Sequence, residues 1–240
     1  MRLLIVAAGF GTRLRKGAKH LVSVWGRPLI YYPLSIAGAF ASKEPLVVVQ
    51  SVYLEETRAR LRENGLDVEL VPSFCPHCEN GYSLLLGLQR VSEPVLLSVA
   101  DHIYEPCLVA RLLSGCPSDA GVCVAGDKDP KLVDIEEATK VKISDGRVRF
   151  SKSLEDYDYV DTGVFIVRDV RGLVERFEGR RDLTMNMLWS EYSASGGVIT
   201  VVDVTGCRWG DVDTEGDLAS FESGGRRVLL EEILLESGGL

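Results

Sequence analysis

The chain has 240 residues and a formal net charge of −8, from 27 basic and 35 acidic side chains, and 46% of its residues are hydrophobic. This length suffices for one large α/β domain with a substantial core, and the acidic charge without a basic stripe argues against a nucleic-acid partner. No apolar run reaches the roughly 18 residues of a membrane span, and glycines and cations follow the N-terminal run in place of a signal-peptide cleavage site. We therefore expect a cytoplasmic protein with no membrane partner.

The first half of the chain alternates short apolar runs with patterns typical of helices. We expect strands at 3–8, 46–50, 68–71 and 95–99, and helices at 29–40, 55–64 and 83–90. This alternation predicts an α/β fold of the Rossmann-like type, with a mixed, mostly parallel sheet flanked by helices. Ligands bind beyond the carboxyl ends of such strands, which places a site near the loop after the first strand and near Asp101, after the fourth.

The second half of the chain has a different pattern. We expect strands at 122–125, 160–167 and 198–204, helices at 173–177 and 184–195, and one or two closing helices within 217–235. Two further strands, at 139–143 and 147–151, are expected to form a hairpin through Ser144-Asp145-Gly146. This hairpin region is expected to serve as a lid or as a substrate-side subdomain. No linker or repeat interrupts the chain, so we expect a single domain over residues 1–240.

The segment after the first strand carries the strongest functional signal in the sequence. Gly9 and Gly11 allow the backbone to turn sharply and to approach a ligand closely, because neither has a Cβ atom. Arg13 and Lys19 then place two cations beside exposed peptide N–H groups, and this combination predicts a polyphosphate site. A plain strand-to-helix turn with surface cations is the structural alternative.

Two well-known phosphate motifs do not fit this loop. A dinucleotide site requires a third glycine, where this chain has Leu14, and an acidic residue roughly 20 positions later. The next strand instead runs into Gln50 and Ser51. A P-loop requires Gly-Lys-Ser/Thr at a spacing that is absent here. The segment is therefore interpreted as a different kind of phosphate-binding loop.

Two acidic segments, far apart in the sequence, each follow an expected strand. Asp101 ends the apolar run 95–100, and Trp209-Gly210-Asp211-Val212-Asp213-Thr214 follows the last long strand. Two carboxylates that meet at one site can hold Mg²⁺, which prefers oxygen ligands. Asp101 could instead cap a turn or a helix, and a lone histidine such as His102 is more often a packing or hydrogen-bonding residue than a metal ligand.

Among the six cysteines, Cys75 and Cys78 have the spacing of a redox or metal-binding pair. No second pair of this kind exists, so a four-sulfur zinc site is not expected. The pair also follows a strand and does not open a helix as in a thioredoxin-like protein. We expect a structural disulfide or plain thiols at these positions.

The loop residues carry a resemblance to a known family. Ala7-Ala8-Gly9-Phe10-Gly11-Thr12-Arg13-Leu14, followed by Lys19 and Leu21, resembles the signature of the nucleotidyltransferases that make NDP-sugars and related compounds. In that family the pattern is roughly A-A-G-x-G-x-R-L and then P-K-x-L. The chain departs from it at Ala18, where proline is usual, and this departure concerns the rigidity of the loop.

The resemblance implies a fold of the nucleotide-diphospho-sugar transferase type, with a nucleotide-binding half at about 1–115 and an acceptor-binding half at about 116–240. In the family, one aspartate ends the fourth strand and another lies in a W-x-D-x-x-T segment. The matching positions are Asp101 and Asp211, which are thus the implied Mg²⁺ ligands, and Asp213 is the competing choice for the second. Arg13 would hold the leaving pyrophosphate, and Lys19 would neutralise charge on the α-phosphate.

The resemblance also implies which residues bind the two substrates. The expected nucleotide-binding residues are Ala7, Ala8, Gly9, Gly11, Asn80, Gly81 and Ser83. The expected acceptor-binding residues are Lys152, Asp161 and Gly163. Segments 135–141, 151–154 and 157–165 are similar to those of the archaeal CTP:inositol-1-phosphate cytidylyltransferases, which favours CTP and inositol-1-phosphate as substrates. Enzymes of this branch often carry a second, membrane-bound domain, and none is expected in these 240 residues.

The implied activity is Mg²⁺-dependent transfer of a nucleotidyl group from an NTP to a phosphorylated polyol, with release of pyrophosphate, by a protein that acts alone or as a homodimer. A close alternative uses another NTP and a hexose-1-phosphate or phosphocholine acceptor. A non-catalytic nucleotide-sensing regulatory subunit of the same fold should have lost the cations or the acids. Arg13, Lys19, Asp101 and Asp211 are all present, which favours the enzyme.

Overall fold

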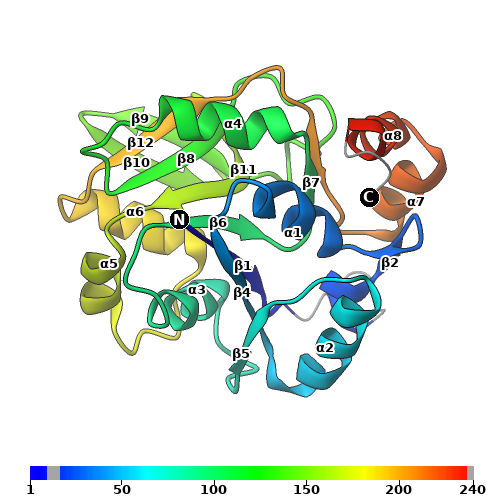
Figure 1. Cartoon of the computed structure of the whole chain (residues 1–240). Helices are drawn as coiled ribbons and strands as arrows, with labels where there is room; N and C mark the ends of the chain where they lie inside the picture. The colour runs from blue at the N-terminus through cyan, green and yellow to red at the C-terminus, as the bar shows by residue number, and fades with distance from the viewer. Residues whose placement is uncertain (10–16, 237–240) are drawn as a thin grey trace.

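A nine-stranded mixed sheet runs through the computed structural model, which describes residues 1–9 and 17–236 (Figure 1). The strand order is β10-β9-β11-β6-β1-β4-β5, and β8 and β12 are added through β11. Strands β1, β4, β5 and β6 are parallel to one another, as the alternating pattern predicts. They span Arg2–Ala7, Lys43–Gln50, Glu69–Ser73 and Val95–Val99.

Strand β11 (Tyr159–Val167) joins the parallel part of the sheet to the second half of the chain. It pairs antiparallel with β6, with β8 (Val122–Asp127) and with β9 (Lys140–Ser144). Strand β12 (Ile199–Asp203) is parallel to β8. The sheet is therefore mixed, and the antiparallel β11 is the point at which strands from both halves of the chain share hydrogen bonds.

Alternation of apolar residues along the central strands creates two cores. Leu3 and Ile5 face one core, and Leu4 and Val6 face the other, because neighbouring side chains of a strand point to opposite faces. The first core is covered by α1 (Tyr31–Gly38), α2 (Leu54–Glu63), α4 (Pro106–Gly115), α7 (Glu215–Ser223) and α8 (Arg227–Glu236). The second is covered by α3 (Asn80–Leu88), α5 (Val170–Phe177) and α6 (Met185–Ala194). Each expected helix and strand is thus confirmed, with ends that move by a few residues.

The expected hairpin is also confirmed, and it extends the sheet. Strands β9 and β10 (Arg147–Ser151) pair around a turn in which Asp145 and Gly146 both have positive φ, at 51° and 72°. This backbone geometry matches the twist of the two strands. Strand β9 bonds to β11, and α6 packs over β10, where Ser193 Oγ accepts a hydrogen bond from Val148 N at 2.7 Å. The hairpin therefore forms one edge of the sheet and is not a separate lid.

Four short strands and one helix are absent from the sequence-based expectations. Strand β2 (Ser23–Val24) pairs with β3 (Arg27–Pro28), and β7 (His102–Tyr104) pairs with β13 (Trp209–Asp211). Helix α4 begins at Pro106, a position where proline is favoured because the first helical N–H has no partner within the helix. Short 3-10 turns lie at Lys19–Leu21 and Ser51–Tyr53.

All six cysteines are paired in this fold. Cys75 is bonded to Cys78, so of the two expected alternatives, a disulfide or plain thiols, the structure has the disulfide, and two further bonds link Cys107 to Cys207 and Cys116 to Cys123. Within the described ranges, none of the helices has both the length and the apolar character needed to cross a bilayer.

Candidate active site

A pocket of about 240 Å³ lies beyond the carboxyl end of β6. It is lined by residues from both halves of the chain, which the sheet brings to one place. Six of the predicted site residues are among them: Asn80, Asp101, Lys152, Asp161, Gly163 and Asp211. The crevice that the parallel strands predict is thus present in the structure.

The two-stranded ribbon β7–β13 delivers the acidic residues to the pocket. Its residue pairs are Tyr104 with Trp209, Ile103 with Gly210, and His102 with Asp211. One more hydrogen bond, from Val212 N to Asp101 O at 3.0 Å, continues the ribbon toward the pocket. The ribbon therefore places the residues around 101 beside those around 212, although they are far apart in the sequence.

Lys19 lies between two of these acids. Its Nζ donates a hydrogen bond to Asp101 Oδ2 at 2.6 Å and also to Asp213 Oδ1. Only 13% of the lysine side chain is exposed, against 29% of Asp101 and 19% of Asp213, so the lysine is the most buried of the three charged groups. The sequence had left Asp213 as the second choice, and the structure turns its carboxylate into the site.

Asp211 lines the same pocket in a different environment. Its backbone oxygen accepts a hydrogen bond from Arg226 Nη1 at 2.7 Å, and its carboxylate lies 4.0 Å from the same guanidinium. The backbone of Asp213 is fixed by α7, because its N–H donates a hydrogen bond to Asp217 Oδ2 at 3.1 Å. Asp217 is also the third residue of α7 and forms a capping box with Thr214. The start of α7 thus fixes the segment that carries Asp213.

Lys19, Asp101 and His102 perturb one another's protonation, and the pKa of Lys19 is raised by its two carboxylates despite its burial. Burial raises the pKa of Asp101, but the Lys19 ammonium and the hydrogen bond from His102 outweigh it and hold this pKa well below its usual range. Burial lowers the pKa of His102, but the 2.9 Å contact of its Nδ1 with Asp101 Oδ1 and the nearby charge of Asp211 raise it overall. Asp101 is therefore a carboxylate, and Lys19 an ammonium, at neutral pH.

Asp161 lines the same pocket, close enough to His102 to interact with its charge. Burial raises its pKa to about 6, although the backbone N–H of Gly163 donates to its Oδ1 at 2.8 Å and favours the charged form. Gly163 has a φ of +75°, and a Cβ atom there would meet Val99 Cγ2 at 2.6 Å and the His102 ring at 3.3 Å. A glycine is favoured at this position because the φ is positive and because a Cβ atom would clash with Val99.

Several lining residues were not predicted from the sequence. The Nζ of Lys152 lies 3.6 Å from Glu137 Oε2, and Asn186 Nδ2 donates to Thr139 Oγ1 at 3.0 Å. Glu137 and Thr139 lie in segment 135–141, which carries part of the family resemblance. That resemblance could have identified both as candidate site residues. Nothing in the local sequence distinguishes Asn186 from any other residue of an amphipathic helix.

The expected nucleotide-binding residues differ in their burial and in their hydrogen bonds. The oxygen of Ala8 accepts a hydrogen bond from Gln50 Nε2 at 3.0 Å, Ala7 is buried, and Gly9 is exposed. The N–H of Gly81 donates to Leu183 O at 3.0 Å. Ser83 is buried in α3, and Asn80 Oδ1 accepts a hydrogen bond from Met185 N at 2.8 Å. Gly11 and Arg13 lie outside the described residues.

The donor set fits a magnesium ion that is shared with substrate. In the described part of the chain, no group of three or more histidine, cysteine or carboxylate side chains could hold a metal ion without further ligands. Mg²⁺ is commonly bound by one or two carboxylates, with substrate phosphates and waters completing its shell. Asp101 and Asp213 already face one positive charge, the Lys19 ammonium, and so have the arrangement that such a site requires.

The family model for MobA-like NTP transferase domains matches residues 3–193. A protein named bifunctional IPC transferase and DIPP synthase from Archaeoglobus fulgidus is 34% identical over 219 residues, which cover 91% of this chain and 42% of that protein. A relative of the same name from Rubrobacter xylanophilus is 35% identical over 224 residues, covering 91% of this chain and 50% of the relative. The chain thus spans about half the length of these curated relatives.

The fold is similar to that of a solved structure described as the inositol-1-phosphate CTP transferase from T. maritima. The two superpose with a TM-score of 0.84 at 24% sequence identity, over 97% of this chain and 96% of the other. A putative glucose-1-phosphate thymidylyltransferase from Bacillus anthracis superposes with a TM-score of 0.76 at 16% identity, over 93% and 94% of the two chains. These likenesses confirm the expected fold class.

Proposed function

The chain belongs to the family of MobA-like NTP transferase domains, and from this premise we propose that it transfers a cytidylyl group from CTP to inositol-1-phosphate and releases pyrophosphate. The names of the relatives and the similarity of segments 135–141, 151–154 and 157–165 support this choice of substrates. The observation that carries the proposal is the pairing of Asp101 and Asp213 around Lys19 in the pocket.

In the proposed reaction, a phosphate oxygen of the acceptor attacks the α-phosphorus of CTP in line with the departing pyrophosphate. The attacking oxygen already carries negative charge, so no general base is required. The protein must position two polyanions close together and offset their charge. Asp101, together with Asp213 or Asp211, would hold the Mg²⁺, which when bound supplies positive charge between the phosphates.

Lys19 would offset the charge that develops on the α-phosphate. Its ammonium already lies beside the carboxylates that would hold the Mg²⁺, so its charge is placed at the site before the substrates bind. Arg13 is proposed to bind the pyrophosphate. Lys152 would attract the acceptor phosphate, and the Asp161 carboxyl would bind hydroxyl groups of the polyol.

A pyrophosphate-release assay tests the proposal. The protein is incubated with Mg²⁺, each of the four NTPs, and a panel that contains inositol-1-phosphate, hexose-1-phosphates and phosphocholine. We expect pyrophosphate and a CDP-linked product with CTP and inositol-1-phosphate. Product from another NTP or acceptor would reject the substrate assignment and keep the reaction type. No product from any pair, with Asp101→Asn as the blank, would favour the nucleotide-sensing alternative.

A further inference from the structure

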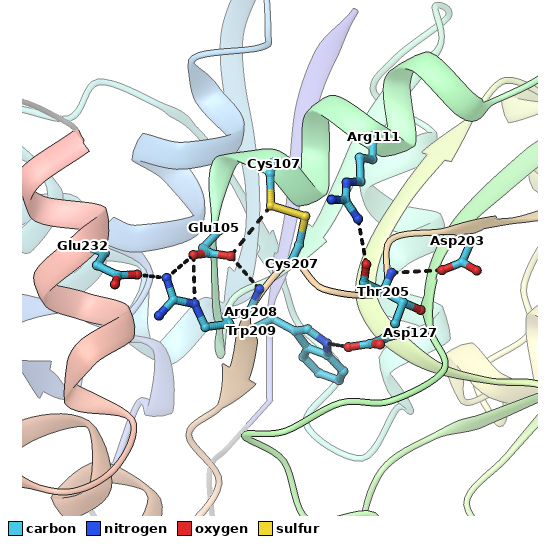
Figure 2. Close-up of a disulfide and its surroundings, with 10 residues drawn as sticks. All are labelled: Glu105, Cys107, Arg111, Asp127, Asp203, Thr205, Cys207, Arg208, Trp209 and Glu232. Atoms are coloured by element: carbon cyan, nitrogen blue, oxygen red, sulfur yellow. Dashed lines mark hydrogen bonds and ion pairs between the residues drawn. A yellow bond between two sulfur atoms is a disulfide. The ribbon is translucent and has the colours of Figure 1, made fainter.

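The β7–β13 ribbon is fixed at the end remote from the pocket by a clamp of charged residues. Beyond the pair of Tyr104 and Trp209, Glu105 N donates to Arg208 O at 3.0 Å. Glu105 Oε2 accepts from Arg208 N at 2.6 Å, and its Oε1 accepts from Arg208 Nε at 3.0 Å (Figure 2). Arg208 also pairs with Glu232 of α8. The two strands are therefore joined by both backbone and side chains at this position.

A covalent bond lies beside this clamp. Cys107 in the first turn of α4 is bonded to Cys207, the residue before Arg208 (Figure 2). The same helix contacts the loop a second time, where Arg111 Nη1 donates to Thr205 O at 2.7 Å. The loop that leads into β13 is thus attached to α4, and through Arg208 to α8, before it reaches the site.

The register of this ribbon decides which residues face the site. Alternate residues of a strand point to opposite sides, so a slip of β13 by one position would turn Asp211 away from the pocket and displace the segment that carries Asp213. The ring of Trp209, which stacks on His102 at 5.6 Å and donates to Asp127 Oδ2 at 2.9 Å, would turn as well. A two-stranded ribbon this short is marginal on its own, so its register needs support from outside.

We propose that the Cys107–Cys207 disulfide and the Glu105–Arg208 pair position the catalytic acids by holding the register of the β7–β13 ribbon. This inference rests on the proposed nucleotidyl transfer, because it assigns these four residues to the placement of Asp213 beside Asp101. The four residues themselves do not line the pocket at Asp101, and they act through the ribbon.

The chain provides a matched control in a second disulfide. Cys116–Cys123 attaches the residue after the other end of α4 to β8, and neither cysteine lines the pocket. The test compares Cys107→Ser/Cys207→Ser with Cys116→Ser/Cys123→Ser at a temperature well below the Tm of both. We expect both variants to melt at lower temperature. Only the first should lose kcat, by about tenfold or more, with the KM for CTP changed less than about threefold, since small misplacements of catalytic groups are costly.

A second readout does not depend on activity. The chain has three histidines, so the imidazole signals in an NMR spectrum can be assigned by single substitutions. His102 should shift in the Cys107→Ser/Cys207→Ser protein, because it lies between Asp101 and Trp209, while the His20 signal of the core stays in place. Glu105→Gln, which keeps the disulfide and an oxygen for Arg208 N, should show the same changes to a smaller extent.

The outcomes separate this inference from the proposed function. If the two disulfide variants change kcat and the His102 signal to the same extent, or if neither changes them, the positioning role is overturned. If the unaltered protein transfers no nucleotidyl group, the proposed function fails. The His102 signal then still shows whether the disulfide holds the ribbon.

Discussion

Lys19 is the residue on which the charge balance of the site depends. Its ammonium contacts carboxylates from two distant parts of the chain, Asp101 and Asp213, in a place that water hardly reaches. Removal of one partner from such a group leaves the remaining charges uncompensated. We therefore expect Lys19 to have two separable effects, one on the stability of the metal-free protein and one on turnover.

We expect Lys19→Ala to lower kcat by about 10²-fold or more, because one preorganised charge contact contributes about 3 kcal/mol in a transition state. Without Mg²⁺, the Tm should also fall, since Asp101 and Asp213 would repel each other, and Mg²⁺ should restore most of it. Steady-state kinetics and thermal melts with and without EDTA measure both effects.

The matched control is another lysine that pairs with two aspartates. Lys142 Nζ lies 2.9 Å from Asp156 Oδ2 and 3.4 Å from Asp158 Oδ1, on the edge hairpin. Lys142→Ala should leave both kcat and the Mg²⁺ dependence of the Tm unchanged. Near-normal turnover of Lys19→Ala would remove this residue from the mechanism.

The two acids of the last segment should differ in their effect on activity. We expect Asp213→Asn to reduce kcat by about 10²-fold or more, because this carboxylate shares a cation with Asp101. Asp211→Asn should cost less, because its carboxylate lies nearer Arg226. The rate is measured as a function of Mg²⁺ concentration. Loss of a metal ligand should raise the Mg²⁺ concentration needed for half-maximal rate. A larger loss of kcat in Asp211→Asn than in Asp213→Asn would instead favour Asp211 as the second metal ligand, as its spacing from Trp209 suggested.

At the scale of elements, the start of α7 and the β7–β13 ribbon hold the site from two sides. The capping box of α7 uses Asp217 and Thr214, and Asp217 also accepts the backbone N–H of Asp213. Arg226, which precedes α8, pairs with Asp217 at 2.9 Å and bonds to the Asp211 backbone. A helix start thus has both a structural and a positioning function here.

We expect Asp217→Ala to destabilise the protein by about 1–2 kcal/mol through loss of the cap and to lower kcat several-fold through movement of Asp213. Asp169→Ala is the control, since Asp169 caps α5 by accepting from Gly172 N at 3.0 Å and lies outside the pocket lining. Denaturant unfolding and kcat are measured for both. An equal loss of kcat in the two variants would show that only stability is affected.

The elements with strong periodicity were the ones that the sequence could predict. Strands of the parallel sheet lack a period but are continuous apolar runs bounded by turn residues, so the local pattern of apolar residues predicts their positions. Strands β7 and β13 have three residues each, too few for any period, and they exist because they pair with each other. The Cys107–Cys207 bond depends on that pairing, so the spacing of the cysteines could not reveal it.

Contacts between distant residues also limited how well the acids of the site could be predicted. Asp101 was predictable because it follows a central strand, whose carboxyl end opens on the crevice. The choice between Asp211 and Asp213 depends on the direction of each side chain after the ribbon ends. That direction is set by the capping of α7, which is local, and by Lys19, which is a tertiary contact from the other end of the chain.

For the whole molecule, buried titratable groups couple stability to pH. His20 is only 2% exposed, and its Nε2 lies 2.8 Å from Thr57 Oγ1, while burial lowers its pKa to about 4. The unfolded chain, with a histidine pKa near 6.5, therefore binds the proton more readily than the folded protein. Asp161 acts in the opposite direction, because its raised pKa of about 6 makes the folded state bind a proton more readily.

The His20 contribution is fully present above about pH 6.5 and is lost as the pH falls through 4. We expect His20→Gln to be less stable than the unaltered protein at pH 7.5. The difference between the two in free energy of unfolding should shrink by about 2–3 kcal/mol on going to pH 4. His77→Gln, at an exposed position, is the control. If this difference in free energy of unfolding does not change with pH, the pKa of His20 is not lowered in the folded protein.

The order of the strands along the chain affects the order in which parts of the site can form during synthesis. The last strand of the large sheet ends at Asp203, and the family model matches residues only up to 193, yet Asp213 comes later in the chain. Chains are synthesised from the N-terminus, so all nine strands emerge before the second acid of the site does. A growing chain can thus pair the strands of its sheet before α7 and α8 arrive to complete the first core and before Asp213 arrives to contact Lys19. Assembly of the sheet and completion of the charge cluster around Lys19 are then successive events in the synthesis of one molecule.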